Sequence, residues 1–145
     1  MLSTALAVAA SLIAAGPSGP SLPTGRWITT DRSAVLQFSN CAGRSCGTLV
    51  WAREGLAGRD ERNDDRRLRQ RPLCNLPIIG ALSSDGGGKW AGGWLYDPES
   101  GVTFGLRLIE ERTALKLFLT DERGRVVATE TLRPAPKHEA CTGVR

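Results

Sequence analysis

Residues 102–120 read VTFGLRLIEERTALKLFLT, and this stretch decides the class of fold. Apolar side chains occupy every second position from Phe104 to Leu108 and again from Leu115 to Leu119. A period of two residues places these side chains on one face of an extended chain. The short polar connection between the two runs is typical of a hairpin. The stretch therefore predicts two adjacent antiparallel strands, each with one face toward a core.

Similar short runs occur along the rest of the chain, separated by turn residues every eight to twelve positions. We expect strands at residues 25–30, 34–38, 47–52, 76–82, 89–96, 102–109, 114–120 and 126–132. Eight sequential strands with hairpin-length links favour an all-β, antiparallel up-and-down barrel over a sandwich, because closure removes exposed sheet edges. A barrel of this size is either filled by its own side chains or holds one small ligand.

The N-terminal segment has the character of a targeting signal. Residues 2–15 are uncharged and mostly apolar, and they are too few to span a bilayer. We predict a signal peptide at 1–15, a Pro/Gly/Ser linker at 16–23, a barrel domain at 24–134 and a C-terminal tail at 135–145. The alternative is an uncleaved N-terminal helix or anchor. No integral membrane span is expected in the mature chain, which we place in the periplasm or outside the cell.

Four cysteines agree with export, because an even count fits a disulfide framework. Pairing of Cys41 with Cys46 and of Cys74 with Cys141 is favoured, and Cys46–Cys74 is the main competitor. The spacing does not fit a zinc site and the single histidine, His138, lies in the tail. The sequence therefore predicts neither a metal site nor a cofactor.

A long charged loop follows the third expected strand, from Asp60 to Leu73. Long loops in compact domains are uncommon and often functional. Its polar residues are expected to form a structural network that ties the loop down, with one of the arginines as the alternative contact for an anionic ligand group. The network residues are Asp60, Asn63 and Asp65, and the arginines are Arg69 and Arg71. Further along the chain, Asp97 is expected to stabilise the turn at residues 97–101.

Four large aromatic residues lie near this loop and on the fifth strand: Trp51, Trp90, Trp94 and Tyr96. Filling of the core is the simpler interpretation. As pocket lining, together with Arg69 and Arg71, they would give an apolar wall with a few polar groups, which is the usual composition of a ligand site. Trp90, Trp94 and Tyr96 have the same parity, so regular pairing would place all three on one face.

Neither nucleic-acid binding nor a recognised reaction is indicated. The formal net charge is +4, but arginines and carboxylates are interleaved in the loop, so self-pairing accounts for them. The chain has no nucleophile motif with a partner histidine. A carboxylate pair such as Asp60 and Asp97 leaves a barrel enzyme as a remote alternative, so the enzyme class stays open and non-catalytic binding is favoured.

The chain resembles a bacterial exported family, domain of unknown function 2147, which has a lipocalin-like barrel. Gly25-x-Trp27 resembles the lipocalin signature on a first strand. The more specific motifs are Cys46-Gly47-x-x-Val50-Trp51, Asp60-x-x-Asn63-x-Asp65-x-x-Leu68-Arg69-x-Arg71-Pro72-Leu73-Cys74 and Trp90-x-x-Gly93-x-x-Tyr96-Asp97-Pro98-x-x-Gly101.

The resemblance implies a lipocalin- or calycin-like barrel in which Trp27 closes one end and Arg133 covers its indole ring. It carries no established reaction, ligand or protein partner. The leading hypothesis is therefore binding of a small apolar or amphipathic molecule, with the charged loop over the barrel mouth. The competing hypothesis is an envelope protein acting through protein contacts, whose barrel is filled by Leu106, Leu108, Leu115, Leu117 and Leu119.

Overall fold

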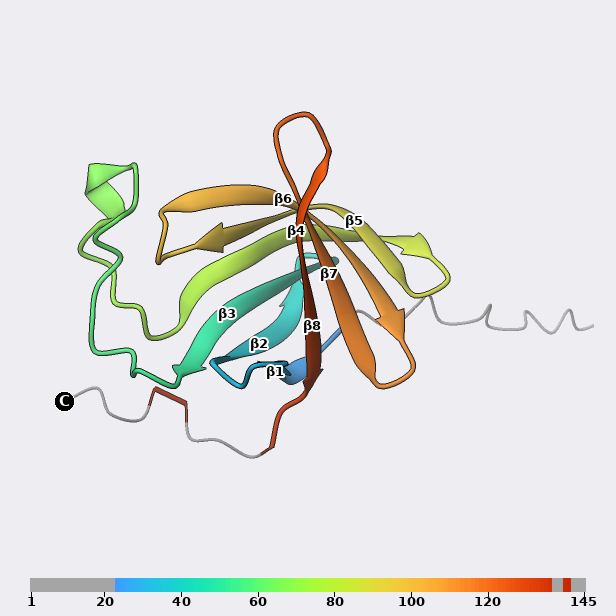
Figure 1. The fold of residues 1–145 in the computed structure, drawn as a ribbon, viewed down its shortest axis with the longest axis horizontal. Helices are drawn as coiled ribbons and strands as arrows, with labels where there is room; N and C mark the ends of the chain where they lie inside the picture. Colours follow the sequence, from blue (N-terminus) through green and yellow to red (C-terminus); the bar gives the residue numbers. More distant parts are fainter. Residues whose placement is uncertain (1–22, 137–139, 142–145) are drawn as a thin grey trace, which may run out of the picture.

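Eight antiparallel strands form one closed barrel, in which β8 returns to pair with β1 (Figure 1). The structure, a computed structural model, describes residues 23–136 and 140–141. The expected signal peptide, nearly all of the linker and His138 lie outside the described residues. The strands are β1 (Gly25–Thr29), β2 (Ala34–Cys41), β3 (Arg44–Ala52), β4 (Leu76–Gly86), β5 (Lys89–Asp97), β6 (Val102–Glu111), β7 (Ala114–Thr120) and β8 (Val126–Pro134). The eight-stranded barrel expected from the sequence is confirmed.

Two hairpins extend further than the sequence pattern indicates. Ala42 and Gly43 have φ of 53° and 80° at the β2–β3 turn, and Gly87 and Gly88 have φ of 61° and 74° at the β4–β5 turn. Two-residue turns with both φ positive match the twist of the flanking strands. Pairing therefore continues to Cys41–Arg44 and to Gly86–Lys89.

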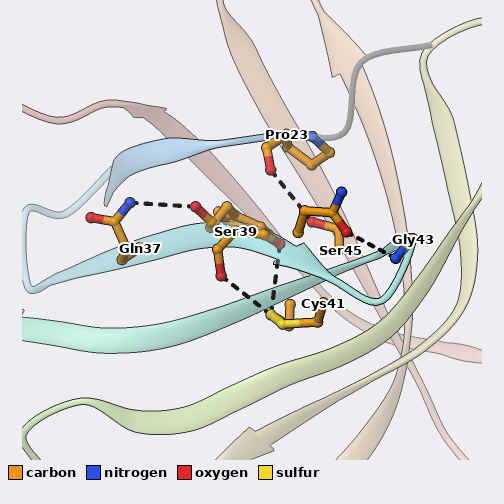
Figure 2. The surroundings of a disulfide bond; sticks show 9 residues. Pro23, Gln37, Ser39, Cys41, Gly43 and Ser45 are labelled. Carbon is orange, nitrogen blue, oxygen red and sulfur yellow. Dashed lines mark hydrogen bonds between the residues drawn. A yellow bond between two sulfur atoms is a disulfide. The ribbon is translucent and has the colours of Figure 1, made fainter. Parts of the chain in front are cut away.

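Both disulfides have the pairing that the sequence favours. Cys41–Cys46 lies on the β2–β3 hairpin, where the Gly43 N–H donates to the Asn40 side chain at 2.9 Å (Figure 2). Cys74–Cys141 joins residues 67 positions apart and attaches the chain end to the segment before β4. No other cysteine is present, so all four are oxidised.

One end of the barrel interior is filled. Trp90 is 1 % exposed, and it packs among leucines and Phe38 that are equally inaccessible. This filled end lies toward the β2–β3, β4–β5 and β6–β7 turns. Its most deeply buried side chains are Phe38, Leu82, Trp90, Leu106, Leu108 and Leu115.

A second apolar cluster lies on the outer face of β1–β3. Ile28, Val35 and Val50 are buried there, with Trp51 and Ala135 packed against them. The described parts of the C-terminal tail contact this region, because the Ala135 N–H donates to Arg26 O at 2.9 Å and the Cys141 N–H donates to Val50 O at 2.7 Å. Ala135 and Cys141 are thus attached to the barrel.

The expected contact between Trp27 and Arg133 is not formed. Trp27 lies opposite Pro134 and packs against the barrel interior, whereas Arg133 lies opposite Ile28 and is exposed. Neighbouring positions on a strand face opposite sides of the sheet, so the sheet lies between the two side chains. The indole of Trp27 instead donates to Thr24 O at 2.9 Å.

Candidate functional site

The other end of the barrel contains a cavity of about 510 Å³. It lies among the ends of β1, β3, β5 and β7, on the side of the long loop. Leu117 and Leu119, which a solid barrel would use as filling, line this cavity instead. Its apolar wall consists of Leu36, Leu49, Ile78, Leu95, Phe104, Leu117, Leu119 and Leu132, with Ala34, Ala52 and Ala128.

The charged lining of the cavity is mostly acidic. Arg53, Glu54, Asp97 and Glu99 lie at the rim, and Glu130 comes from the wall of β8. The Arg53 guanidinium donates to the backbone oxygen of Asp31. The carboxylate of Asp97 accepts from the Glu99 N–H at 3.0 Å and from the Ser100 hydroxyl at 2.7 Å, which is the turn role expected from the sequence.

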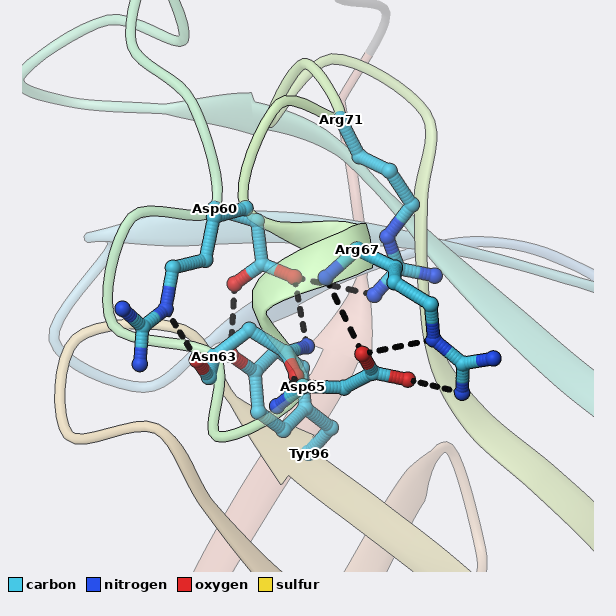
Figure 3. Close-up of polar contacts among 7 residues, drawn as sticks. Asp60, Asn63, Asp65, Arg67, Arg71 and Tyr96 are labelled. Carbon is cyan, nitrogen blue, oxygen red and sulfur yellow. Dashed lines mark hydrogen bonds and ion pairs between the residues drawn. The ribbon is translucent and has the colours of Figure 1, made fainter.

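Beside the cavity, the charged loop is organised around the buried carboxylate of Asp60 (Figure 3). This side chain is fully inaccessible to solvent. Its Oδ1 accepts from the Tyr96 hydroxyl at 2.5 Å, and its Oδ2 accepts from Asn63 Nδ2 at 2.8 Å and from an Arg71 terminal nitrogen at 2.9 Å. Buried charges require such partners, so this set explains how the loop holds a carboxylate away from water.

These contacts set the protonation states of the Asp60–Tyr96 pair. Burial alone raises the pKa of Asp60, but hydrogen bonds from Tyr96, Arg71 and Asn63 outweigh burial and hold the pKa below its ordinary value. Burial and the adjacent Asp60 carboxylate raise the pKa of Tyr96 to about 12. At neutral pH, therefore, the pair consists of a carboxylate and a protonated phenol.

The other charged residues of the loop make separate contacts. Asp65 is the N-cap of the short 3-10 helix η1 (Arg66–Leu68). It pairs with the side chain of Arg67 through two hydrogen bonds of 3.0 and 2.8 Å. Arg69 donates to the backbone oxygen of Asn63 at 2.6 Å. The bidentate arginine of the loop is therefore Arg67, which the sequence does not distinguish from its neighbours.

The loop lies beside the cavity and does not cover it. No residue from Asp60 to Leu73 is among those that line the cavity. The loop instead reaches the turn between β5 and β6, where Arg62 donates to Glu99 O at 2.6 Å. The sequence predicts that this loop covers the barrel mouth, and this prediction is wrong. In the structure the loop packs against the side of the barrel.

A β-bulge in β5 separates the aromatic residues. Trp90 pairs with Leu108 but Gly93 pairs with Leu106, so one extra residue is inserted, and Gly92 takes a φ of 72°. The bulge reverses the facing of the strand. Trp90 therefore points into the filled core, whereas Trp94 lies on the outer face with 37 % exposure. The expectation of one shared face is wrong for this pair.

The predicted ligand residues consequently divide among several places. Tyr96 alone among them borders the cavity, Trp51 packs in the outer cluster and Trp90 fills the core. Arg71, Trp94 and Tyr96 meet at a separate, more open groove of about 700 Å³ between the loop and the outer face of β5 and β6. The ligand site expected from the six residues is therefore not a single site.

The sequence model of the family described as "Uncharacterized protein conserved in bacteria (DUF2147)" matches residues 25–127, from β1 into β8. The chain belongs to this family. A similar solved structure is protein HP1028 from the human pathogen Helicobacter pylori, which is described as belonging to the lipocalin family. The two are 19% identical with a TM-score of 0.71, over 81% of this chain and 86% of that one. This likeness shows a shared fold. No curated protein matches the chain significantly.

Among residues 23–136 and 140–141, no group of three or more His, Cys, Asp or Glu side chains is placed to hold a metal ion. Over the same residues, no helix is long and apolar enough to cross a membrane.

Sequence reasoning missed Glu130. This residue lies opposite Leu117, and on β8 it alternates with Leu132 and Ala128, all of which line the cavity. The available signal was its spacing of two residues from the apolar side chains of Ala128 and Leu132 within the expected strand 126–132, because such positions face the same side of a sheet. A glutamate in a strand is usually exposed to solvent, so its charge does not by itself indicate a place in a cavity wall.

Proposed function

We propose that this protein is exported and binds a small apolar or amphipathic molecule inside its barrel, without catalysing a reaction on it. The observation that carries the proposal is the cavity of about 510 Å³ with its wall of leucine, isoleucine and phenylalanine. Ligand pockets typically measure about 300–1,000 Å³ and combine an apolar lining with a few polar groups. The lipocalin-like fold supports this use of the interior, by analogy of fold.

The polar groups near the cavity support binding over catalysis. The buried carboxylate of Asp60 lies outside the cavity lining, and its oxygens accept from three side-chain donors. Asp97 is engaged in its own turn. The two carboxylates that sequence reasoning kept as a remote catalytic pair therefore do not face a common substrate position.

Export is supported by the two disulfides, because such bonds persist in oxidising compartments. An N-terminal segment with the composition of a signal peptide agrees with it. Peptide sequencing of the mature N-terminus after expression in a bacterium tests this part, and recovery of the uncleaved chain from the cytoplasm contradicts it.

Native mass spectrometry of protein purified from the periplasm without detergent tests the binding. We expect an adduct of a few hundred daltons that denaturation releases. The variant Ala128→Phe fills the cavity from β8 and should abolish the adduct, whereas Thr129→Phe, on the outer face of the same strand, should retain it. A clean apo mass for the wild type, with no shift after incubation with apolar and amphipathic compounds, contradicts the proposal and favours a barrel that acts through protein contacts.

A further inference from the structure

A single carboxylate, that of Glu130, projects from the apolar wall of the cavity. Its pairing partner across the sheet is Leu117, which is 1 % exposed, and the next inward-facing residue on β8 is Leu132, which is 0 % exposed. Glu130 is half-buried, and its carboxylate makes no hydrogen bond or ion pair with any residue that the structure describes. This charge therefore has no partner in the part of the chain that the structure describes.

The rest of the charged lining does not compensate for Glu130. The cavity has four carboxylates, from Glu54, Asp97, Glu99 and Glu130, against the single guanidinium of Arg53. That guanidinium already contacts the backbone oxygen of Asp31. The chain as a whole carries a formal net charge of +4, so the acidic character belongs to the cavity and not to the protein in general.

An unpaired carboxylate in an apolar wall costs free energy unless a counter-charge approaches it. Such a site favours a cation and disfavours an anion, because the effective dielectric constant near the wall is lower than in water. The remaining wall, which consists of leucine and other apolar side chains, accommodates a hydrocarbon group.

Resting on the proposed function, we propose that the natural ligand of this cavity is an amphiphile with a cationic group, an amine or a guanidine, that pairs with Glu130. The hydrocarbon part occupies the space lined by Leu36, Leu49 and Leu132. Arg53 is held at the rim by its contact with Asp31 and does not serve as an anchor for a carboxylate. Fatty acids are therefore the wrong class of ligand for this barrel.

The test is isothermal titration calorimetry of the mature protein with three compounds of equal chain length: decylammonium, decanol and decanoate. For the wild type we expect decylammonium to bind roughly ten- to a hundredfold more tightly than decanol, the range for a hydrogen bond to a charged group. Decanoate should bind most weakly. Glu130→Gln should bring decylammonium to about the affinity of decanol, whereas Glu111→Gln, which removes the same charge at the filled end, should change neither.

The outcomes separate this inference from the proposed function. Equal affinities for the three compounds, tightest binding of decanoate, or unchanged decylammonium binding in Glu130→Gln overturns the cationic ligand while leaving a binding barrel. Failure of all three to bind, together with a clean apo mass, overturns both. Unchanged decanol binding shows that Glu130→Gln keeps its cavity, and if that variant does not fold, the order of the three compounds on the wild type still decides.

Discussion

The hydroxyl of Tyr96 donates a 2.5 Å hydrogen bond to Oδ1 of Asp60, and this contact joins the charged loop to the barrel wall. The two residues are 36 positions apart, and both are buried. Arg71 and Asn63 donate to the other carboxylate oxygen, so the side chain of Asp60 holds the beginning and the end of the loop together.

Asp60→Ala is expected to destabilise the protein by roughly 3 kcal/mol. Removing one partner of a buried ion pair typically costs about 3–5 kcal/mol, and Arg71 is partly exposed, which places the loss at the lower end. Urea unfolding followed by circular dichroism measures it. Asp65→Ala is the matched control, because its pair with Arg67 lies at the surface, and the loss there should be much smaller. Equal losses would contradict a special role for Asp60.

The hydrogen-bonded pair of Asp60 and Tyr96 should limit the stability of the protein at both extremes of pH. The pKa of Asp60 is lower in the folded than in the unfolded protein. Its contribution to the free energy of unfolding is therefore present above a pH of about 4 and is lost as the pH falls through the folded pKa. Tyr96 has a folded pKa of about 12, above the ordinary value of 10.0, so its contribution is lost as pH rises from 10.0 toward 12. Thermal unfolding across pH, compared between wild type and Tyr96→Phe, checks the alkaline limb, which should flatten in the variant.

How far the sequence predicts this molecule can be judged from particular elements. The prediction of two paired strands from the alternation at residues 102–120 is correct, because β6 and β7 pair without a bulge. The prediction that Trp90 and Trp94 share one face is wrong, because one residue is inserted at the bulge around Gly92 and turns Trp94 to the opposite face. A bulge depends on cross-strand pairing, which a single strand's pattern does not contain. The cavity also depends on how eight strands pack, so its volume could not be predicted from any of them.

The loop illustrates the same limit. Its residues Asp60, Asn63 and Arg71 form the network that composition predicts, because buried charges need partners. Where the loop lies relative to the mouth is decided by Arg62 and the β5–β6 turn. Arg62 has no distinguishing neighbours in sequence, so the sequence predicts a loop over the barrel mouth where the structure has one that packs against the side of the barrel.

Gly101→Ala should detach the loop from that turn. A Cβ at Gly101 would lie 2.1 Å from the backbone oxygen of Arg62, and backbone atoms cannot yield without moving the loop. Gly124→Ala is the matched control, because Gly124 has a similar φ, 77° against 74°, and no atom within 4 Å of the added Cβ. Positive φ alone costs about 1 kcal/mol. We expect a clearly larger loss for Gly101→Ala, with faster amide hydrogen exchange in residues 59–72. Equal losses and unchanged exchange would show that the contact does not hold the loop.

Glu130→Leu should stabilise the empty barrel while removing its preference for cations. The carboxylate stands in an apolar wall beside Leu117 and Leu132 without a partner among the described residues, so an apolar side chain suits the fold better than the native one. Functional positions commonly trade stability in this way, and we expect a gain of about 0.5–2 kcal/mol in urea unfolding. Thr129→Leu, on the outer face of the same strand, controls for the added apolar surface. A loss of stability in Glu130→Leu would mean that the carboxylate contributes to the fold, and its presence in the cavity would then no longer require a ligand.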